Sequence, residues 1–250
     1  METPLYDQLG TSYTATRRED PDLAGQIHAA LGDSRTVLNV GAGAGAYEPR
    51  DRTVLAVEPS PVMIAQRPAD DIPAVRATAE RLPFADASFD VAMALHTVHH
   101  WSDPATGVGE LRRVARRVVV VAGDARVINR LWLIAEYFPG IAEACARPEV
   151  QPQAIADRLG GRTEVRRLRV PVGCVDGFPE AFIARPEAFL DPALRRNMSP
   201  FRLLPADQVA DGVDRLRHDL ASGTWDARHG ALRRMSHMDV GLRIIVSDPG

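Results

Sequence analysis

The sequence predicts an α/β protein built on a doubly wound, mostly parallel sheet. Apolar stretches of strand length alternate with amphipathic stretches through the first half of the 250 residues, as expected for strands joined by helices. The first apolar stretch runs directly into a glycine-rich loop, and the second ends at an acidic residue, Glu58. Both features fall at strand carboxyl ends, which is where such sheets bind their ligands.

Five strands and three helices account for most of residues 22–122. The strands are expected at residues 36–40, 53–57, 74–77, 89–95 and 118–122, and the helices at 22–31, 60–66 and 104–116. The fourth strand is an apolar run of the kind buried on both faces of a parallel sheet. Ser60 is the expected N-cap of the second helix, with Pro61 at its first position.

The second half of the chain is mainly helical and aromatic. Helical stretches are expected at 127–138, 152–159 and through much of 179–234, and strand-like segments at 163–170 and 239–246. We interpret the chain as a single domain, with 1–31 as an N-terminal helical lid and 124–160 and 176–235 as lid insertions over the sheet edge.

Composition narrows the possible partners. Apolar residues make up 45% of the chain, and the net charge of −3 comes without a block of one sign, which disfavours a nucleic-acid surface. All 30 basic residues are arginine, so no lysine is present as a Schiff-base former or base. Cys145 and Cys174 have no metal-binding spacing.

Without a signal-like start or a membrane-length apolar run, we expect a cytoplasmic protein, monomeric or homodimeric, with no membrane partner.

The glycine loop is the first candidate binding site. Gly41, Gly43 and Gly45 follow the strand at alternate positions, where a backbone without Cβ atoms turns tightly and approaches a ligand closely. Gly41, Gly43 and Ala46 also satisfy the GxGxxA form of a dinucleotide-binding fingerprint. A purely structural glycine turn is the other interpretation at this stage.

Glu58 supports nucleotide binding. It lies 17 residues beyond Gly41, at the end of the next strand, where a carboxylate accepts hydrogen bonds from both hydroxyls of a ribose. A solvated surface charge is the alternative for an isolated glutamate at a strand end.

A second motif makes the resemblance specific. Residues 79–90 read AERLPFADASFD, which resembles the AExLPFxDxSFD signature of class I S-adenosylmethionine-dependent methyltransferases. The resemblance extends over about residues 37–121 and favours the small-molecule branch with the ubiquinone and menaquinone methyltransferases (methyltransferase type 11), which His99-His100-Trp101 also match. It implies a Rossmann-like, seven-stranded, mostly parallel sheet, with S-adenosylmethionine as cofactor and S-adenosylhomocysteine as product.

The resemblance also implies roles for individual residues around the cofactor. Gly41, Ala42 and Gly43 would approach the methionine and ribose, and Glu58 would hold the ribose hydroxyls. Around the adenine and the methionine end, the implied residues are Pro59, Met63, Ala79, Glu80, Leu95 and His96. Tyr13, in the segment before the sheet, is the expected lid residue, and Arg17 or Arg18 nearby could pair with the methionine carboxylate.

Three departures from the family pattern stand out. Asn39 replaces the usual acidic residue at the start of the glycine motif, and Thr78 lies where an aspartate often reaches the adenine amino group. Arg117 leads directly into the fifth strand without the usual Pro-Gly-Gly turn. We still place Asn39 and Thr78 in the cofactor site, with weaker charge complementarity.

The acceptor side offers few bases. Methyl transfer needs an acceptor held in line with the sulfonium and, for a protonated acceptor, a group that removes its proton. His96, His99 and His100 lie near the strand end that faces the cofactor, and we nominate His96 and His100 as catalytic. No carboxylate or cysteine completes a metal set with them, so no metal is expected.

Aromatic residues of the insertions were the candidates for an acceptor pocket. The residues are Trp132, Tyr137, Phe138, Phe182, Phe189, Phe201 and Trp225. The leading hypothesis is methyl transfer to an O, N or C nucleophile of a small molecule in secondary metabolism. The alternatives are a related enzyme that uses the cofactor for a non-methylating reaction, a non-catalytic nucleotide-binding subunit and a nicotinamide-dependent oxidoreductase.

Overall fold

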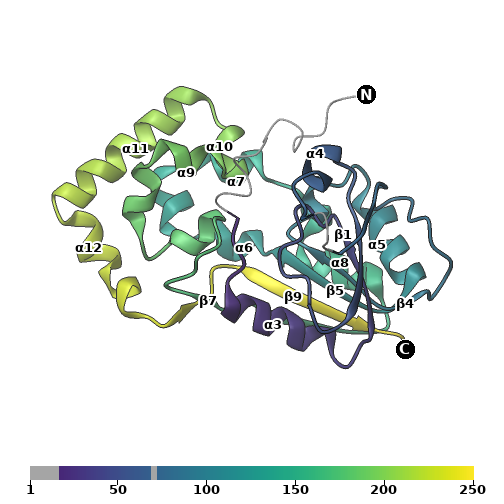
Figure 1. Cartoon of the computed structure of the whole chain (residues 1–250). Coiled ribbons are helices and arrows are strands. Elements are labelled where there is room, and N and C mark those ends of the chain that lie inside the picture. Colours follow the sequence, from purple (N-terminus) through teal and green to yellow (C-terminus); the bar gives the residue numbers. More distant parts are fainter. Residues whose placement is uncertain (1–16, 69–71) are drawn as a thin grey trace.

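Seven strands among the described residues form one sheet. The structure is a computed structural model that describes residues 17–68 and 72–250 (Figure 1). The strands are β1 (Thr36–Val40), β2 (Thr53–Val57), β3 (Ala74–Val75), β4 (Phe89–Leu95), β5 (Ala115–Gly123), β6 (Arg162–Arg167) and β9 (Leu242–Asp248). Their order is β3-β2-β1-β4-β5-β9-β6, with β9 antiparallel to both neighbours and the other pairs parallel. The predicted doubly wound, mostly parallel sheet is confirmed.

The strand order reverses beside β1, and this reversal places the site. β2 pairs with one edge of β1 and β4 with the other, so the connections after β1 and β4 diverge to opposite sides. Doubly wound sheets bind ligands in a crevice at such a reversal, which here lies at the carboxyl ends of β1 and β4. Gly41 follows β1 and His96 follows β4 at this crevice.

Helices cover both faces of the sheet. α3 (Pro21–Leu31) packs against β5 and β9, and its buried Leu23, Ile27 and Leu31 recur at the four-residue spacing of one helix face. The Asp20 carboxylate caps α3 by accepting hydrogen bonds from the Asp22 and Leu23 amides. On the other face α5 (Pro104–Val114) and α8 (Pro152–Leu159) pack against each other and the sheet.

Helices of the second half form a lobe beside the sheet, on the left in Figure 1. Its α-helices are α6 (Ala125–Ile128), α7 (Gly140–Ala144), α9 (Pro192–Arg196), α10 (Ser199–Arg202), α11 (Ala206–Ala221) and α12 (Thr224–His229). Shorter turns are π-helical at Leu133–Tyr137 and 3-10 at Pro148–Val150, Pro179–Phe182, Pro186–Leu190 and Gly230–Arg234. We call this lobe, with its connecting segments between residues 124 and 150 and between 176 and 236, the lid.

Several boundaries differ from the sequence prediction. The strand predicted from 118 begins at Ala115, because Ala115 already pairs with Phe89 of β4. The segment 163–170 divides into β6 and β7 (Val170–Pro171), and β7 pairs with β8 (His237–Met238) in a separate two-stranded sheet. The last strand begins at residue 242 rather than 239, because Gly241 has a φ of +91° that interrupts the extended backbone.

Parts of the predicted lid segments 124–160 and 1–31 cover the sheet instead of belonging to the lid. α8, at the end of the predicted insertion 124–160, packs on α5 and β6 and so covers the sheet. α3, within the predicted N-terminal lid 1–31, also covers the sheet, and residues 1–16 lie outside the described residues. Within residues 17–68 and 72–250, no helix combines the length and the apolar character needed to cross a bilayer.

Two glycines of α5 give a direct test of the packing. A Cβ on Gly107 would lie 2.4 Å from Cε3 of Trp101, whereas a Cβ on the exposed Gly109 would meet nothing within 4 Å. We predict that Gly109→Ala raises the free energy of unfolding by about 0.5–1 kcal/mol, because alanine favours helix. Gly107→Ala should lower it by about 1–3 kcal/mol through overpacking. Urea denaturation of both variants measures the difference, and equal effects would contradict the packing around Trp101.

Candidate cofactor crevice and acceptor cavity

The glycine loop turns directly after β1. Gly41 and Gly43 have φ values of +69° and +54°, in the left-handed region that favours glycine. The amides of Gly41 and Ala42 both donate hydrogen bonds to the Val57 carbonyl, which fastens the loop to the end of β2. A Cβ on Gly41 would lie 2.1 Å from Oγ1 of Thr97. Glycine at 41 is therefore required by the packing of the fold itself.

Glu58 lies against this loop, as the sequence predicts. One carboxylate oxygen accepts a hydrogen bond from the Gly43 amide at 2.8 Å, and the other accepts from the Ser60 amide at 2.9 Å. The side chain is buried. An ionised carboxylate has about four lone-pair positions, so each oxygen can accept more than one hydrogen bond. These two contacts fix the orientation of the Glu58 carboxylate beside the glycine loop, and its role in ribose binding stays a prediction.

Asn39 belongs to a buried network that sequence reasoning missed. Its Nδ2 donates to Oε1 of Glu48 at 2.9 Å, and Nη2 of Arg67 donates to Oε2 of Glu48 at 2.6 Å. Arg67 also donates to the Gly43 and Ile72 carbonyls. An aspartate at 39 would place a second carboxylate against Glu48, which explains the neutral amide. Neither Glu48 nor Arg67 lies in a motif that would have revealed the pair.

The residues assigned to the adenine side surround the ends of β2 and β3. Met63 and Ala79 are buried, Pro59 is partly buried and Thr78 is exposed. Oε1 of Glu80 accepts hydrogen bonds from the Ser102 amide and hydroxyl and from the Asp103 amide. Although burial raises the pKa of Glu80, these and other hydrogen bonds lower it overall. Glu80 therefore ties the segment at Ala79 to the start of α5.

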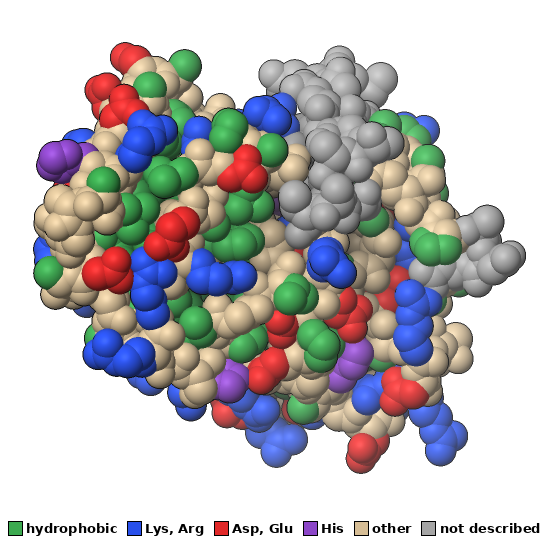
Figure 2. All heavy atoms as spheres, turned by 60° about the vertical axis from the view of Figure 1, so that its left-hand side comes forward, with side chains coloured by type: hydrophobic (Ala, Val, Ile, Leu, Met, Phe, Trp, Pro, Cys, Tyr) green, Lys and Arg blue, Asp and Glu red, His purple; other side chains and the backbone are tan. Residues whose placement is uncertain are grey.

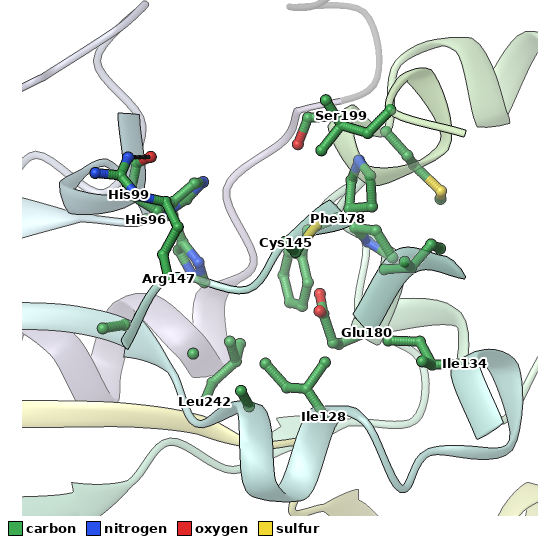
Figure 3. Close-up of a pocket in the computed structure, with 18 of the residues that line it drawn as sticks. His96, His99, Ile128, Ile134, Cys145, Arg147, Phe178, Glu180, Ser199 and Leu242 are labelled. Atoms are coloured by element: carbon green, nitrogen blue, oxygen red, sulfur yellow. Dashed lines mark hydrogen bonds between the residues drawn. The ribbon is translucent and has the colours of Figure 1, made fainter. Parts of the chain in front are cut away.

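A cavity of about 560 Å³ lies between the lid and the ends of β4 and β5. Its size is ordinary for a small-molecule site. His96 and His99 contribute to one wall, and lid residues such as Ile128 and Ile134 to others (Figure 3); His100 also lines the cavity. None of its lining residues comes from the glycine loop, so this cavity is distinct from the crevice at Gly41–Gly43.

The aromatic residues expected to wall an acceptor pocket lie elsewhere. Trp132 contacts the rings of Tyr137, Phe189 and Trp225 edge to face, and its indole N–H donates to the Ile183 carbonyl. The rings of Phe138, Phe182 and Phe201 join the same lid core through other ring contacts. None of the seven lines the cavity, so that hypothesis was wrong: large rings fill the lid's core. Phe178, stacked on His96 at 5.5 Å between ring centroids, is the ring that the sequence did not indicate.

His96 occupies a constrained position after β4. Its φ is +53°, and its amide donates to the Val121 carbonyl of β5. Burial, followed by the charge of Arg17, lowers the pKa of His96 to about 3, and burial also holds the pKa of His100 well below its usual value. Both rings are therefore neutral at pH 7. They are available as hydrogen-bond partners and are weak proton acceptors; their catalytic assignment remains a prediction.

Arg17 lies at the cavity but already has an acidic partner. Its guanidinium donates two hydrogen bonds to the Asp176 carboxylate, at 2.6 and 3.1 Å, and the Tyr47 hydroxyl donates to the same carboxylate at 2.8 Å. Asp176 is buried, so this cluster joins the segment before α3, the glycine loop and the lid. Tyr13 lies outside the described residues.

No group of three or more potential ligands that could hold a metal ion occurs among residues 17–68 and 72–250. Cys174 is buried, and burial raises the pKa of its thiol to about 12, while Cys145 lines the cavity. His96 and His100 belong to no such group.

Comparisons with known proteins agree with this architecture. A family model described as a methyltransferase domain matches residues 38–121. An uncharacterized methyltransferase of Mycobacterium sp. (strain KMS) is 39% identical over 105 residues, which span 40% of each chain. The matched segment thus covers well under two thirds of that relative.

Solved structures extend the similarity over nearly the whole chain. A putative methyltransferase from an antibiotic biosynthesis pathway of Anabaena variabilis has a TM-score of 0.83 and 28% identity, covering 93% of this chain and 98% of its own. Geranyl diphosphate C-methyltransferase from Streptomyces coelicolor, solved with S-adenosyl-L-homocysteine, has a TM-score of 0.50 and 13% identity, covering 91% of this chain and 78% of its own. The latter is a likeness of fold alone.

The buried network at Asn39 gives one stability prediction. Arg67→Met should lower the free energy of unfolding by about 3–5 kcal/mol, because it leaves the Glu48 carboxylate buried without its cation. Arg81→Met, on an exposed arginine, should change it by less than about 0.5 kcal/mol. Guanidinium denaturation measures both, and a similar small effect at both positions would show that the pair does not hold the loop.

The lowered pKa of His96 gives a pH prediction. The unfolded chain takes up a proton at this ring below about pH 6.5, whereas the folded chain resists protonation until about pH 3, so stability is lost as the pH falls. Both proteins should lose free energy of unfolding between pH 7.5 and 5.5, but His96→Gln should lose less of it. The difference between the two losses should be at most about 1.4 kcal/mol. Denaturation at both pH values measures this, with His218→Gln on an exposed histidine as control. An unchanged loss in His96→Gln would mean that His96 is not held neutral.

Proposed function

We propose that the chain, whose residues 38–121 match a methyltransferase-domain model, is a class I S-adenosylmethionine-dependent methyltransferase that methylates an O, N or C nucleophile of a small molecule. The observation that carries the proposal is the cavity of about 560 Å³ at the end of β4, next to the glycine-loop crevice. One crevice suits the cofactor and the adjoining cavity suits an acceptor. Their common border is the β4 end at His96.

The residues of the crevice fit the cofactor. The Glu58 carboxylate is oriented by the Gly43 and Ser60 amides at the end of β2, and the left-handed Gly41 and Gly43 keep the loop free of Cβ atoms. Met63 and Ala79 supply apolar surface beside them for adenine. When bound, S-adenosylmethionine supplies a methyl group on a cationic sulfur.

The chain's own contribution to transfer is positioning. Apolar lid residues exclude water from the cavity and hold the acceptor, whose nucleophile must lie about 3–3.5 Å from the methyl carbon and in line with the sulfur. The half-buried His96 stays neutral beside that position. We place hydrogen bonding to the acceptor, with proton removal where the acceptor is protonated, at His96 or His100.

The proposal includes partners and setting. The similar Anabaena protein, described as belonging to antibiotic biosynthesis, supports a role in secondary metabolism. Figure 2 shows acidic and basic side chains interspersed over the visible face, which supports a small-molecule acceptor rather than a nucleic acid. We further propose a cytoplasmic monomer or homodimer.

The rival functions are separable by product analysis. Incubation with S-adenosylmethionine carrying a trideuterated methyl group, followed by mass spectrometry of candidate acceptors, detects transfer directly. An acceptor that gains the labelled methyl while S-adenosylhomocysteine forms supports the proposal. A changed acceptor without the label would favour a non-methylating enzyme, and binding without turnover would favour a non-catalytic subunit.

Glu58 tests the cofactor assignment. We predict that Glu58→Ala weakens S-adenosylmethionine binding by about ten- to a hundredfold, because hydrogen bonds to a charged group are lost. Isothermal titration calorimetry with S-adenosylmethionine, S-adenosylhomocysteine and NAD measures this, and Glu58→Gln separates loss of charge from loss of shape. An unchanged Kd would remove Glu58 from the site. Preferential binding of NAD would instead support an oxidoreductase.

A further inference from the structure

One acidic side chain lines the cavity. Among the described lining residues, Glu180 is the single aspartate or glutamate, and it lies on the short turn Pro179–Phe182 of the lid. Figure 3 shows its carboxyl group directed into the cavity, among Phe178, Ile128 and Ile134. A carboxylate in such apolar surroundings is uncommon unless it is paired.

Glu180 has no pairing partner among residues 17–68 and 72–250. The favourable interactions of its carboxyl group within those ranges are a hydrogen bond from its own amide and the charge of Arg17. Three arginines also line the cavity: Arg17 pairs with Asp176, Arg147 pairs with Glu149, and Arg202 is exposed to solvent. The inner wall therefore has one acidic group, and no described side chain pairs with it directly.

The surroundings of Glu180 disfavour the ionised form of its carboxyl group. Burial raises the pKa of Glu180, and only the hydrogen bond to its own amide and the more distant charge of Arg17 oppose this. A buried carboxylate without a partner is costly, and a cation that contacts it offsets the cost. The remaining wall is mainly aliphatic, with Ile128, Ile134 and Leu242 around it.

We propose that the small molecule held in this cavity is an amine with a mainly apolar body, and that its ammonium group pairs with the Glu180 carboxylate. The amine complements the charge, and the apolar body complements the aliphatic walls. This inference rests on the proposed function, which assigns the cavity to the acceptor, and it adds the acceptor's chemical class.

Three matched probes test the inference. Each has a naphthyl body and a two-carbon arm, and they end in an amine, an alcohol or a carboxylate. Calorimetric titration into the full chain, with S-adenosylhomocysteine at saturation, compares their Kd values. The amine is expected to bind at least about tenfold more tightly than the alcohol, as for a charge-assisted hydrogen bond. The carboxylate should bind most weakly.

Two variants assign the preference to one residue. Glu180→Gln keeps the shape and removes the charge, and should reduce the preference for amine over alcohol to less than about threefold. Glu143→Gln makes the same charge change at an exposed position of α7 outside the cavity lining, and should preserve the preference. An unchanged Kd for S-adenosylhomocysteine in both variants shows that they are folded.

The outcomes separate this inference from the proposed function. Binding of S-adenosylhomocysteine together with a preference for the alcohol or the carboxylate overturns the amine assignment alone. So does an amine preference that survives Glu180→Gln, or no amine binding at millimolar concentration. If S-adenosylhomocysteine itself fails to bind, the proposed function fails, and the titrations without it still measure the amine preference.

Discussion

The buried ion pair between Glu48 and Arg67 is the interaction on which the cofactor crevice depends. Both side chains are almost fully inaccessible, so the pair depends on hydrogen bonds to its other polar atoms, of which Nε of Arg67 has no partner among the described residues. Asn39 donates to one oxygen of Glu48, and Arg67 donates to carbonyls at Gly43 and Ile72. The network thereby joins β1, the glycine loop and the segment after α4 (Pro61–Ile64). It fixes the loop against which Glu58 is oriented.

The pair also explains a departure that the sequence alone leaves unexplained. An acidic residue at 39 would add a second carboxylate beside Glu48 while removing the amide donor. The resulting repulsion would be felt in a buried, weakly screened environment. The neutral Asn39 is therefore the residue that suits this loop. Its identity does not by itself weaken the case for cofactor binding, because Glu58 and the glycines retain their geometry.

Local sequence patterns were enough to predict the sheet and the position of the glycine loop. Features that depend on contacts between residues far apart in the sequence could not be predicted in this way. β1, β2, β4 and α8 have the predicted boundaries because their signals are contained within the segments: apolar runs, glycines and prolines. Glu48 and Arg67 are 19 residues apart and lie outside regular strands, and Arg17 is 159 residues from Asp176. No local period encodes such contacts. The aromatic residues were misassigned for a related reason, since ring identity does not distinguish a lid core from a cavity wall.

Charge at the border between crevice and cavity follows from the chemistry of a cationic methyl donor. An imidazolium beside a sulfonium would repel it, and burial together with Arg17 lowers the pKa of His96 to about 3, which keeps the ring neutral. The Arg17 guanidinium is itself neutralised by the buried Asp176. The single acidic side chain of the described cavity lining lies instead on the lid, at Glu180. This separation allows a cationic donor and an acceptor with an ammonium group to occupy adjoining sites, because the acceptor's charge is countered on the lid.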